Sequence, residues 1–230
     1  MHLGFAPDRT AYGFAAGTAD GGFDPGYGIH TDIAYLVRHT AAGEVLDTLF
    51  SIERSAHLPP VSYQLAFSPV ISAAIAVDRI YVGQADRYEV RVHDPSGALE
   101  MIIRNSRPPE PIDREVIAAL EEERDAQRRA ATERAFEPAR PASASVPEVF
   151  PAFRGLRTDA AGNLWVRRYA LEDEPVQEWD VYDTGGRWIA VFSGPSHFRI
   201  REITGESVLG VYVDELDVQT VRRYRLNKNG

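Results

Sequence analysis

Short runs of alternating apolar and polar residues, separated by turn residues, recur along the chain. Residues 90–93 are followed by Asp94-Pro95-Ser96-Gly97 and a second run, and residues 179–182 by Asp183-Thr184-Gly185-Gly186 and a second run. Alternation with a period of two is the pattern of a strand with one buried face. Asp-x-x-Gly favours a tight turn, because Gly adopts positive φ and Asp accepts hydrogen bonds from the backbone ahead of it. Each pair of runs therefore predicts a β-hairpin.

A second hairpin is predicted upstream of these hairpins. The clearest example covers residues 153–166, where Asp-Ala-Ala-Gly-Asn at 159–163 separates two alternating runs. Two hairpins per unit predict a four-stranded antiparallel sheet, which is the blade of a β-propeller. Equivalent hairpins are expected at 3–14, 73–82 and 198–213.

Two histidines occupy a fixed position in the repeat. His39 and His93 stand where other copies carry Tyr182 and Tyr224. An aromatic ring at the same place in each copy indicates packing rather than metal binding. We therefore expect both histidines to be structural.

The phrases Asp-Ala-Ala-Gly-Asn-Leu-Trp-Val at 159–166 and Trp-Asp-Val-Tyr-Asp-Thr-Gly-Gly-Arg at 179–187 resemble the blade signature of NHL-like six-bladed β-propellers. Residues 210–224 look like the last blade of the bacterial proteins described as six-bladed β-propellers. The resemblance implies an all-β fold with about four of six blades, each four-stranded, in one partial propeller domain over 1–230. The implied blades cover about 1–54, 72–104, 153–193 and 198–226.

Both ends of the chain bear on this expectation. The last unit has room for only three strands, and the first begins directly on an inner strand, so we expect about two further blades and a closing strand upstream. The alternative of a closed four-bladed ring would pair residues 3–5 with 221–226. A β-sandwich with repeated hairpins is a second alternative.

All the long irregular stretches are expected at one end of the blades, which we call the elaborated face. The largest, 105–152, is predicted to be a helical and linker insertion. Asp113 is its expected N-cap, Glu121–Arg129 is its strongest helix-forming run, and prolines from 138 onwards end it. The helix is either a lid or docking element, or a solvated insertion. The other stretches lie at 15–32, 54–72, 168–177 and 194–197.

Composition limits the classes of partner. The 230 residues carry a net charge of −9, which argues against nucleic acid, although a local arginine pocket can still hold an anion. The absence of Cys excludes disulfides and thiolate metal sites. The longest apolar run, about 70–77, is far below the ~20 residues of a membrane helix. No signal peptide is visible at the first residues, and a signal in an upstream segment would place the protein in the periplasm or outside the cell.

We expect the elaborated face to bind a small molecule or a protein, because loops on a rigid scaffold carry binding. The function expected is a non-catalytic binding scaffold without a cofactor. Propellers resembling this chain also include metal-dependent enzymes, either lactonase-like hydrolases or lyases, with axial ligands for Ca²⁺ or another divalent ion. Under that alternative, part of the metal site would lie in upstream blades. The residues expected to bind the ligand are Tyr27, His30, His57, Tyr63, Arg154, Arg167, His197 and Arg199.

Overall fold

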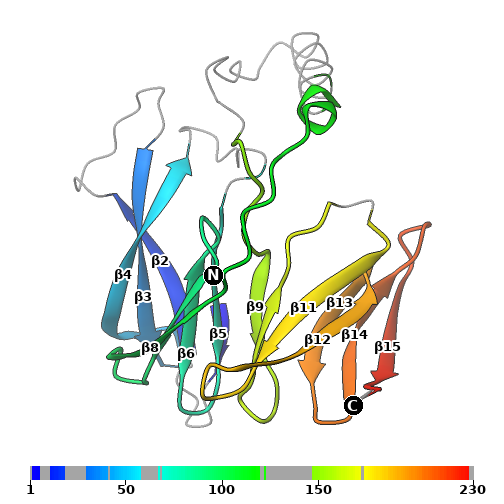
Figure 1. Ribbon diagram of the computed structural model, residues 1–230. Coiled ribbons are helices and arrows are strands. Elements are labelled where there is room, and N and C mark those ends of the chain that lie inside the picture. Colours follow the sequence, from blue (N-terminus) through cyan, green and yellow to red (C-terminus); the bar gives the residue numbers. More distant parts are fainter. Residues whose placement is uncertain are drawn as a thin grey trace.

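The computed structural model describes residues 2–5, 11–18, 30–40, 42–57, 67, 69–119, 122, 147–171 and 174–227, and for 2–5, 11, 14–18, 30–32 and 53–57 only the backbone. The described chain is nearly all β, in four antiparallel sheets that follow one another along the sequence (Figure 1). Sheet 1 contains β1 (His2–Phe5), β2 (Ala11–Thr18), β3 (His30–His39) and β4 (Val45–His57). Sheet 2 contains β5 (Ile71–Ile75), β6 (Ile80–Gln84), β7 (Glu89–His93) and β8 (Leu99–Arg104). Sheet 3 contains β9 (Gly155–Thr158), β10 (Leu164–Arg167), β11 (Val176–Tyr182) and β12 (Trp188–Pro195). Sheet 4 contains β13 (Phe198–Ile203), β14 (Ser207–Val213) and β15 (Gln219–Arg225).

The predicted hairpins are present, and the last sheet has three strands as expected. One correction concerns sheet 1, whose strands are longer than the sequence pattern indicated. Thr18 pairs with Asp32, and His30 pairs with His57, at positions that we had assigned to loops. There the pairing of β2 with β3 and of β3 with β4 continues through backbone hydrogen bonds, which do not require the apolar–polar alternation from which the strands were predicted.

The hairpin turns repeat one hydrogen-bonding device. Oδ1 of the first Asp accepts the backbone N–H groups two and four residues ahead, at 2.8–3.0 Å. The fourth turn residue has positive φ, which Gly adopts without a steric penalty. The Asp residues are Asp94, Asp159, Asp183 and Asp214, and the matching positive-φ residues are Gly97, Gly162, Gly186 and Asp217.

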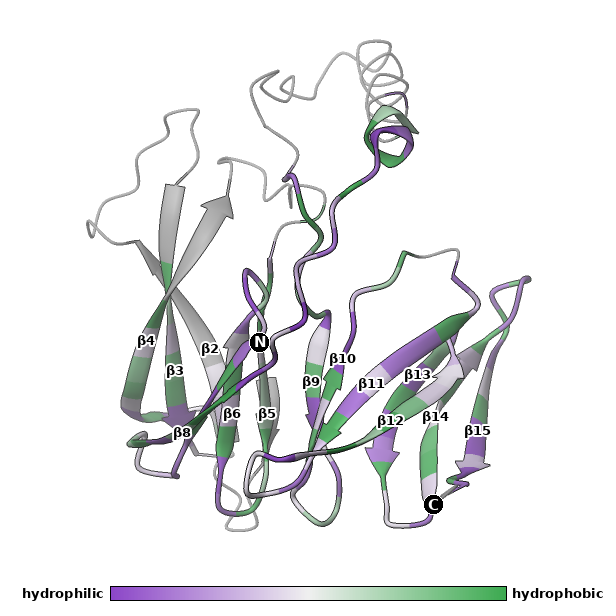
Figure 2. Cartoon of the chain, in the orientation of Figure 1, coloured by the Kyte–Doolittle hydropathy of each residue, from purple (hydrophilic) through white to green (hydrophobic). Residues whose placement is uncertain are grey.

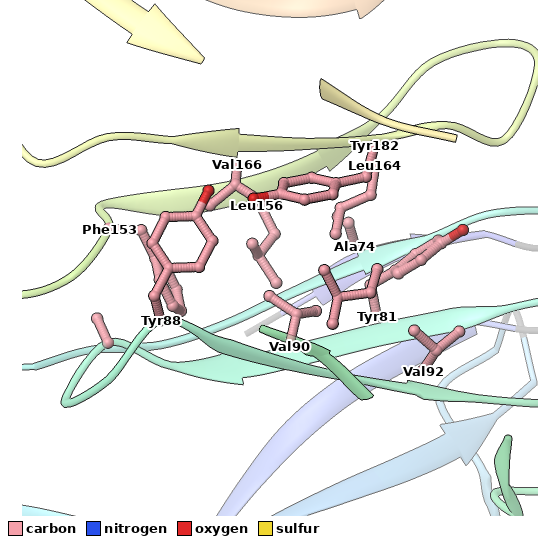
Figure 3. Close-up of a cluster of buried hydrophobic side chains, with 12 residues drawn as sticks. Ala74, Tyr81, Tyr88, Val90, Val92, Phe153, Leu156, Leu164, Val166 and Tyr182 are labelled. Carbon is pink, nitrogen blue, oxygen red and sulfur yellow. The ribbon is translucent and has the colours of Figure 1, made fainter. Parts of the chain in front are cut away.

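Sheets 2 and 3 are each covered on both faces, which explains why their second strands are apolar at successive positions. In β6, Ile80 and Val82 pack toward sheet 1, whereas Tyr81 packs toward sheet 3. In β10, Leu164 and Val166 face sheet 2, and Trp165 faces sheet 4. A strand buried on both sides loses the period-two alternation of a half-exposed strand. Figure 2 shows apolar residues along these strands, and Figure 3 shows the cluster between sheets 2 and 3.

Neighbouring sheets are also joined by hydrogen bonds near their first strands. The Leu156 N–H donates to Ser72 Oγ at 2.9 Å, and the Thr158 hydroxyl donates to the Ile75 carbonyl at 2.8 Å, so β5 and β9 lie side by side. The Ala160 N–H donates to the Ile203 carbonyl at 3.0 Å and joins sheet 3 to sheet 4. Successive sheets therefore pack in chain order.

The sheets do not close by strand pairing within the described residues. There β1 pairs only with β2, and β15 only with β14, so the pairing required by a closed four-bladed ring is absent. Four sheets in chain order also differ from the two layers of a β-sandwich.

The insertion after β8 rises from the body as two extended segments. They pair through a bridge between Pro111 and Val149, and residues 114–119 then form a helical turn (Figure 1). The Ile117 N–H donates to the Asp113 carbonyl, which places Asp113 at the expected N-cap. The predicted helical run at 121–129 lies outside the described residues except for Glu122, which is helical.

Candidate functional site

A cleft of about 830 Å³ opens between sheets 2 and 3 beside the base of the insertion. Its walls come from parts of the chain that are far apart in sequence, namely 86–89, 104–110, 150–152, 168–170 and 174–178. The volume falls in the ~300–1,000 Å³ range of small-molecule sites. The wall residues at 105–110, 150–152, 168–170 and 174–177 lie in two of the stretches that we expected on the elaborated face, 105–152 and 168–177.

One side of the cleft is organised around Asp180, which is only 1% exposed. Arg168 binds this carboxylate with two nitrogens, Nε to Oδ2 at 3.1 Å and Nη2 to Oδ1 at 2.7 Å. The Tyr88 hydroxyl donates to Oδ2 at 2.9 Å, and Trp188 Nε1 donates to Oδ1 at 3.3 Å. A buried carboxylate with this many donors is held as an anion, and it fixes the side chains around it.

The ionisation of this network follows from its geometry. Burial alone would raise the pKa of Asp180, but hydrogen bonds from Arg168 and Tyr88 and the nearby positive charges bring this pKa below its ordinary value. Burial raises the pKa of Tyr88 far above its ordinary value, and Tyr182 and Asp180 add to that shift. Asp180 is therefore ionised and Tyr88 is neutral at physiological pH.

Aromatic rings form another part of the wall. The rings of Phe150 and Tyr169 stack at 5.1 Å between centroids, and Phe67 meets Phe150 edge-on at 5.2 Å. The Arg154 guanidinium lies 5.9 Å from the Tyr169 ring centroid and donates to the Ala170 carbonyl at 3.1 Å. Arg154 thus supports this wall, although it is not among the residues that line the cleft.

The other sequence-predicted site residues lie elsewhere. Tyr27 and Tyr63 are outside the described residues, and the described backbone places His30 and His57 opposite each other at the ends of β3 and β4. His197 and Arg199 are exposed at the start of β13. Arg167 ends β10, beside Arg154, whose N–H donates to the Arg167 carbonyl at 2.7 Å. Arg154 and Arg167 are therefore brought together, while His197 and Arg199 lie on the neighbouring sheet.

Arg167, like Arg157, forms no ion pair with an acidic side chain within the described residues. Its Nε is buried without a hydrogen-bond acceptor. Arg157 lies on the same face of sheet 3, since it pairs with Trp165, two residues before Arg167. Burial lowers the pKa of Arg167, and the charges of Arg154 and Arg157 lower it further. Burial also lowers the pKa of Arg157, with a contribution from Arg201.

The sequence reasoning missed Asp180 and Arg168. A signal was present, because Asp180 lies between Trp179 and Val181 in a strand whose neighbours are buried, and an acid in such a strand requires a cationic partner. The partner follows from pairing, since Arg168 is the residue after β10, and its N–H donates to the Glu178 carbonyl. Its side chain also forms an ion pair with the Glu178 carboxylate.

Within the part of the chain that the structure describes, no group of three or more His, Asp or Glu side chains is placed to hold a metal ion. No described helix is long and apolar enough to cross a membrane.

Comparison with known proteins shows similarity among solved structures but not in sequence. No protein family matches the chain, and no curated protein is similar to it. Among solved structures, a luciferin-regenerating enzyme is similar over 98% of this chain, with 12% sequence identity and a TM-score of 0.37. The chain spans 60% of the length of that protein.

Proposed function

We propose that this chain is a non-catalytic binding scaffold whose four sheets are blades of an NHL-like six-bladed β-propeller. In this interpretation the blades occupy the four sheet regions in chain order, and the 105–152 insertion stands on the elaborated face. Two features support the blade assignment: the repeated Asp-x-x-Gly hairpins and the packing of each sheet on the next.

The observation that carries the binding function is the cleft between sheets 2 and 3. Its walls combine stacked aromatic rings with charged side chains that are already paired within the protein, such as Arg104 with Glu89 at 2.9 Å. Paired charges and a buried Asp180 network hold the walls in place before a ligand arrives. A preorganised cleft lowers the entropy that binding costs. We assign the ligand, a small molecule or a short segment of a protein, to this cleft.

The test uses a variant that fills the cleft without touching its network. Val176 lines the cleft and is 45% exposed, so Val176→Trp adds bulk there with little cost to folding. Val191 is exposed on β12 and does not line the cleft, so Val191→Trp is the matched control. A small-molecule library is screened by ligand-observed NMR against the three proteins. Ligands that bind the wild type and Val191→Trp but not Val176→Trp would support the cleft as the binding site.

Two results would count against the proposal. Compounds that bind all three proteins equally would place binding elsewhere. Turnover of a bound compound, or one divalent ion per chain after extensive dialysis, would favour the hydrolase or lyase interpretation instead.

A further inference from the structure

We propose that the arginines at the boundary of sheets 3 and 4 form an anion-binding site, which takes a phosphate or carboxylate group of a small molecule. This inference goes beyond the proposed function, because it concerns a different place in the molecule. It holds whether or not the cleft between sheets 2 and 3 takes a ligand.

The first step is the position of the two central arginines. Arg157 on β9 pairs with Trp165, and Arg167 on β10 pairs with Trp179 on β11. Both tryptophans belong to the core between sheets 3 and 4. Because opposite residues on paired strands share a face, Arg157 and Arg167 both project to the side of sheet 3 that meets sheet 4.

The second step is charge. Within the described residues no carboxylate forms an ion pair or hydrogen bond with Arg157, Arg167 or Arg201, although each of these lies in a protein of net charge −9. Elsewhere in the same chain arginines are paired, as Arg38 is with Asp47 at 2.7 Å. Arg157 and Arg167 are like charges on one face of sheet 3 and both are partly removed from water, which raises the free energy of the unliganded site. An anion would relieve that cost.

The third step is the set of polar atoms left without partners. Arg167 Nε, Trp179 Nε1 and Ser196 Oγ are all buried and have no hydrogen-bond partner. Arg167 and Trp179 are directly opposed, and Ser196 lies in the β12–β13 connection that joins the two sheets. All three atoms can donate a hydrogen bond, and the first two can only donate. A ligand group with several hydrogen-bond acceptors would satisfy these donors at the boundary of sheets 3 and 4.

The fourth step is access. Arg157 and Arg167 are each only partly buried, so solvent reaches both side chains. Arginine presents its donors in a planar fork that matches the oxygens of phosphate and carboxylate. A small anion therefore fits this boundary better than a neutral or cationic ligand.

The test compares the melting temperature in chloride with that in phosphate and in citrate at constant ionic strength and pH. Phosphate, citrate or both are expected to raise the melting temperature of the wild type above that in chloride. Arg157→Gln and Arg167→Gln each remove one central charge and should lose this gain. Arg225→Gln removes an exposed arginine from β15 and should keep it. A gain from one anion alone identifies phosphate or carboxylate as the group recognised.

Titration calorimetry of the effective anion provides a second readout. Its apparent affinity should fall by about tenfold or more in each central variant, as expected for the loss of a charge-assisted hydrogen bond. In chloride, the two central variants should melt at the wild-type temperature or above it, because the like-charge repulsion is reduced. If one of these variants does not fold, the other carries the test.

Either of two outcomes would overturn the inference. Equal melting temperatures of the wild type in all three salts would mean that water alone satisfies the buried donors. A gain that persists in Arg157→Gln and Arg167→Gln would place the anion elsewhere on the protein.

Discussion

The Tyr88 hydroxyl donates a hydrogen bond of 2.9 Å to Oδ2 of Asp180, across the boundary between sheets 2 and 3. The two residues are 92 positions apart in the chain. Since Arg168 holds the same carboxylate from within sheet 3, one buried anion ties the two sheets together beside the cleft. The shape of the cleft therefore depends on this contact.

Replacing Tyr88 by Phe removes only the hydroxyl from this contact. We expect a loss of about 1.5–3 kcal/mol in the free energy of unfolding, the usual contribution of a hydrogen bond to a charged group. Urea denaturation of the two proteins measures it. Tyr35→Phe is the control, because Tyr35 is partly buried and no hydrogen bond to its hydroxyl is found in the described chain, and it should change stability by less than about 0.5 kcal/mol. Equal losses in both variants would contradict the assignment.

Asp180→Asn should destabilise the protein at neutral pH by about 3 kcal/mol, because Arg168 loses its buried counter-charge. The folded-state pKa of Asp180 is below the ordinary value of an unfolded chain. Its stabilising effect is therefore present above about pH 4 and is lost as the pH falls through the folded-state pKa. The difference in unfolding free energy between wild type and variant should shrink as urea denaturation is repeated from pH 6 down to pH 3. If this difference in unfolding free energy stayed constant from pH 6 to pH 3, the lowered pKa of Asp180 would be contradicted.

Asp217 occupies the positive-φ position that Gly97, Gly162 and Gly186 hold in the equivalent turns, with φ of 59°. A residue with a Cβ atom is less stable in this conformation than Gly. Asp217→Gly should therefore raise the free energy of unfolding by up to about 1 kcal/mol, with the greater chain entropy of Gly reducing the gain. Thermal unfolding is the measurement. Gly162→Ala, the reverse change in an equivalent turn, should lower stability.

Gly83 in β6 leaves no space for a side chain. A Cβ atom there would lie 2.8 Å from Phe153 Cζ and 2.9 Å from the Glu89 carbonyl oxygen. We expect Gly83→Ala to cost about 1–3 kcal/mol through overpacking, measured by urea denaturation. Gly205→Ala is the matched control, since a Cβ atom there meets nothing within 4 Å. Equal stability of the two variants would contradict the close packing described at Gly83.

Local patterns were sufficient to predict most strands and turns. The turns at Asp94 and Asp183 follow from four residues each, and no distant contact is needed to recognise them. The structural role of two histidines also followed from the repeat: His39 and His93 are buried, and His93 stacks on Phe50 at 4.1 Å between ring centroids.

The site was harder to predict because its residues meet only through packing between sheets. Tyr88 lies in the connection after β6, and neither its own sequence context nor that of Asp180 reveals the other as a partner. Arg154 and Arg167 were both among the residues predicted to bind the ligand, and the Arg154 N–H donates to the Arg167 carbonyl. Arg157 was not predicted, because a charged residue in a short strand is normally assigned to solvent.

The last strand, β15, carries a consequence for how copies of this protein meet. Within the described residues, the outer edge of β15 pairs with no other strand. The strand contains Arg222, Arg223 and Arg225. Two such edges aligned side by side would bring these positive charges together, so the edge repels a copy of itself. This repulsion weakens as salt is added, so the charged edge hinders self-association of the protein most strongly at low ionic strength.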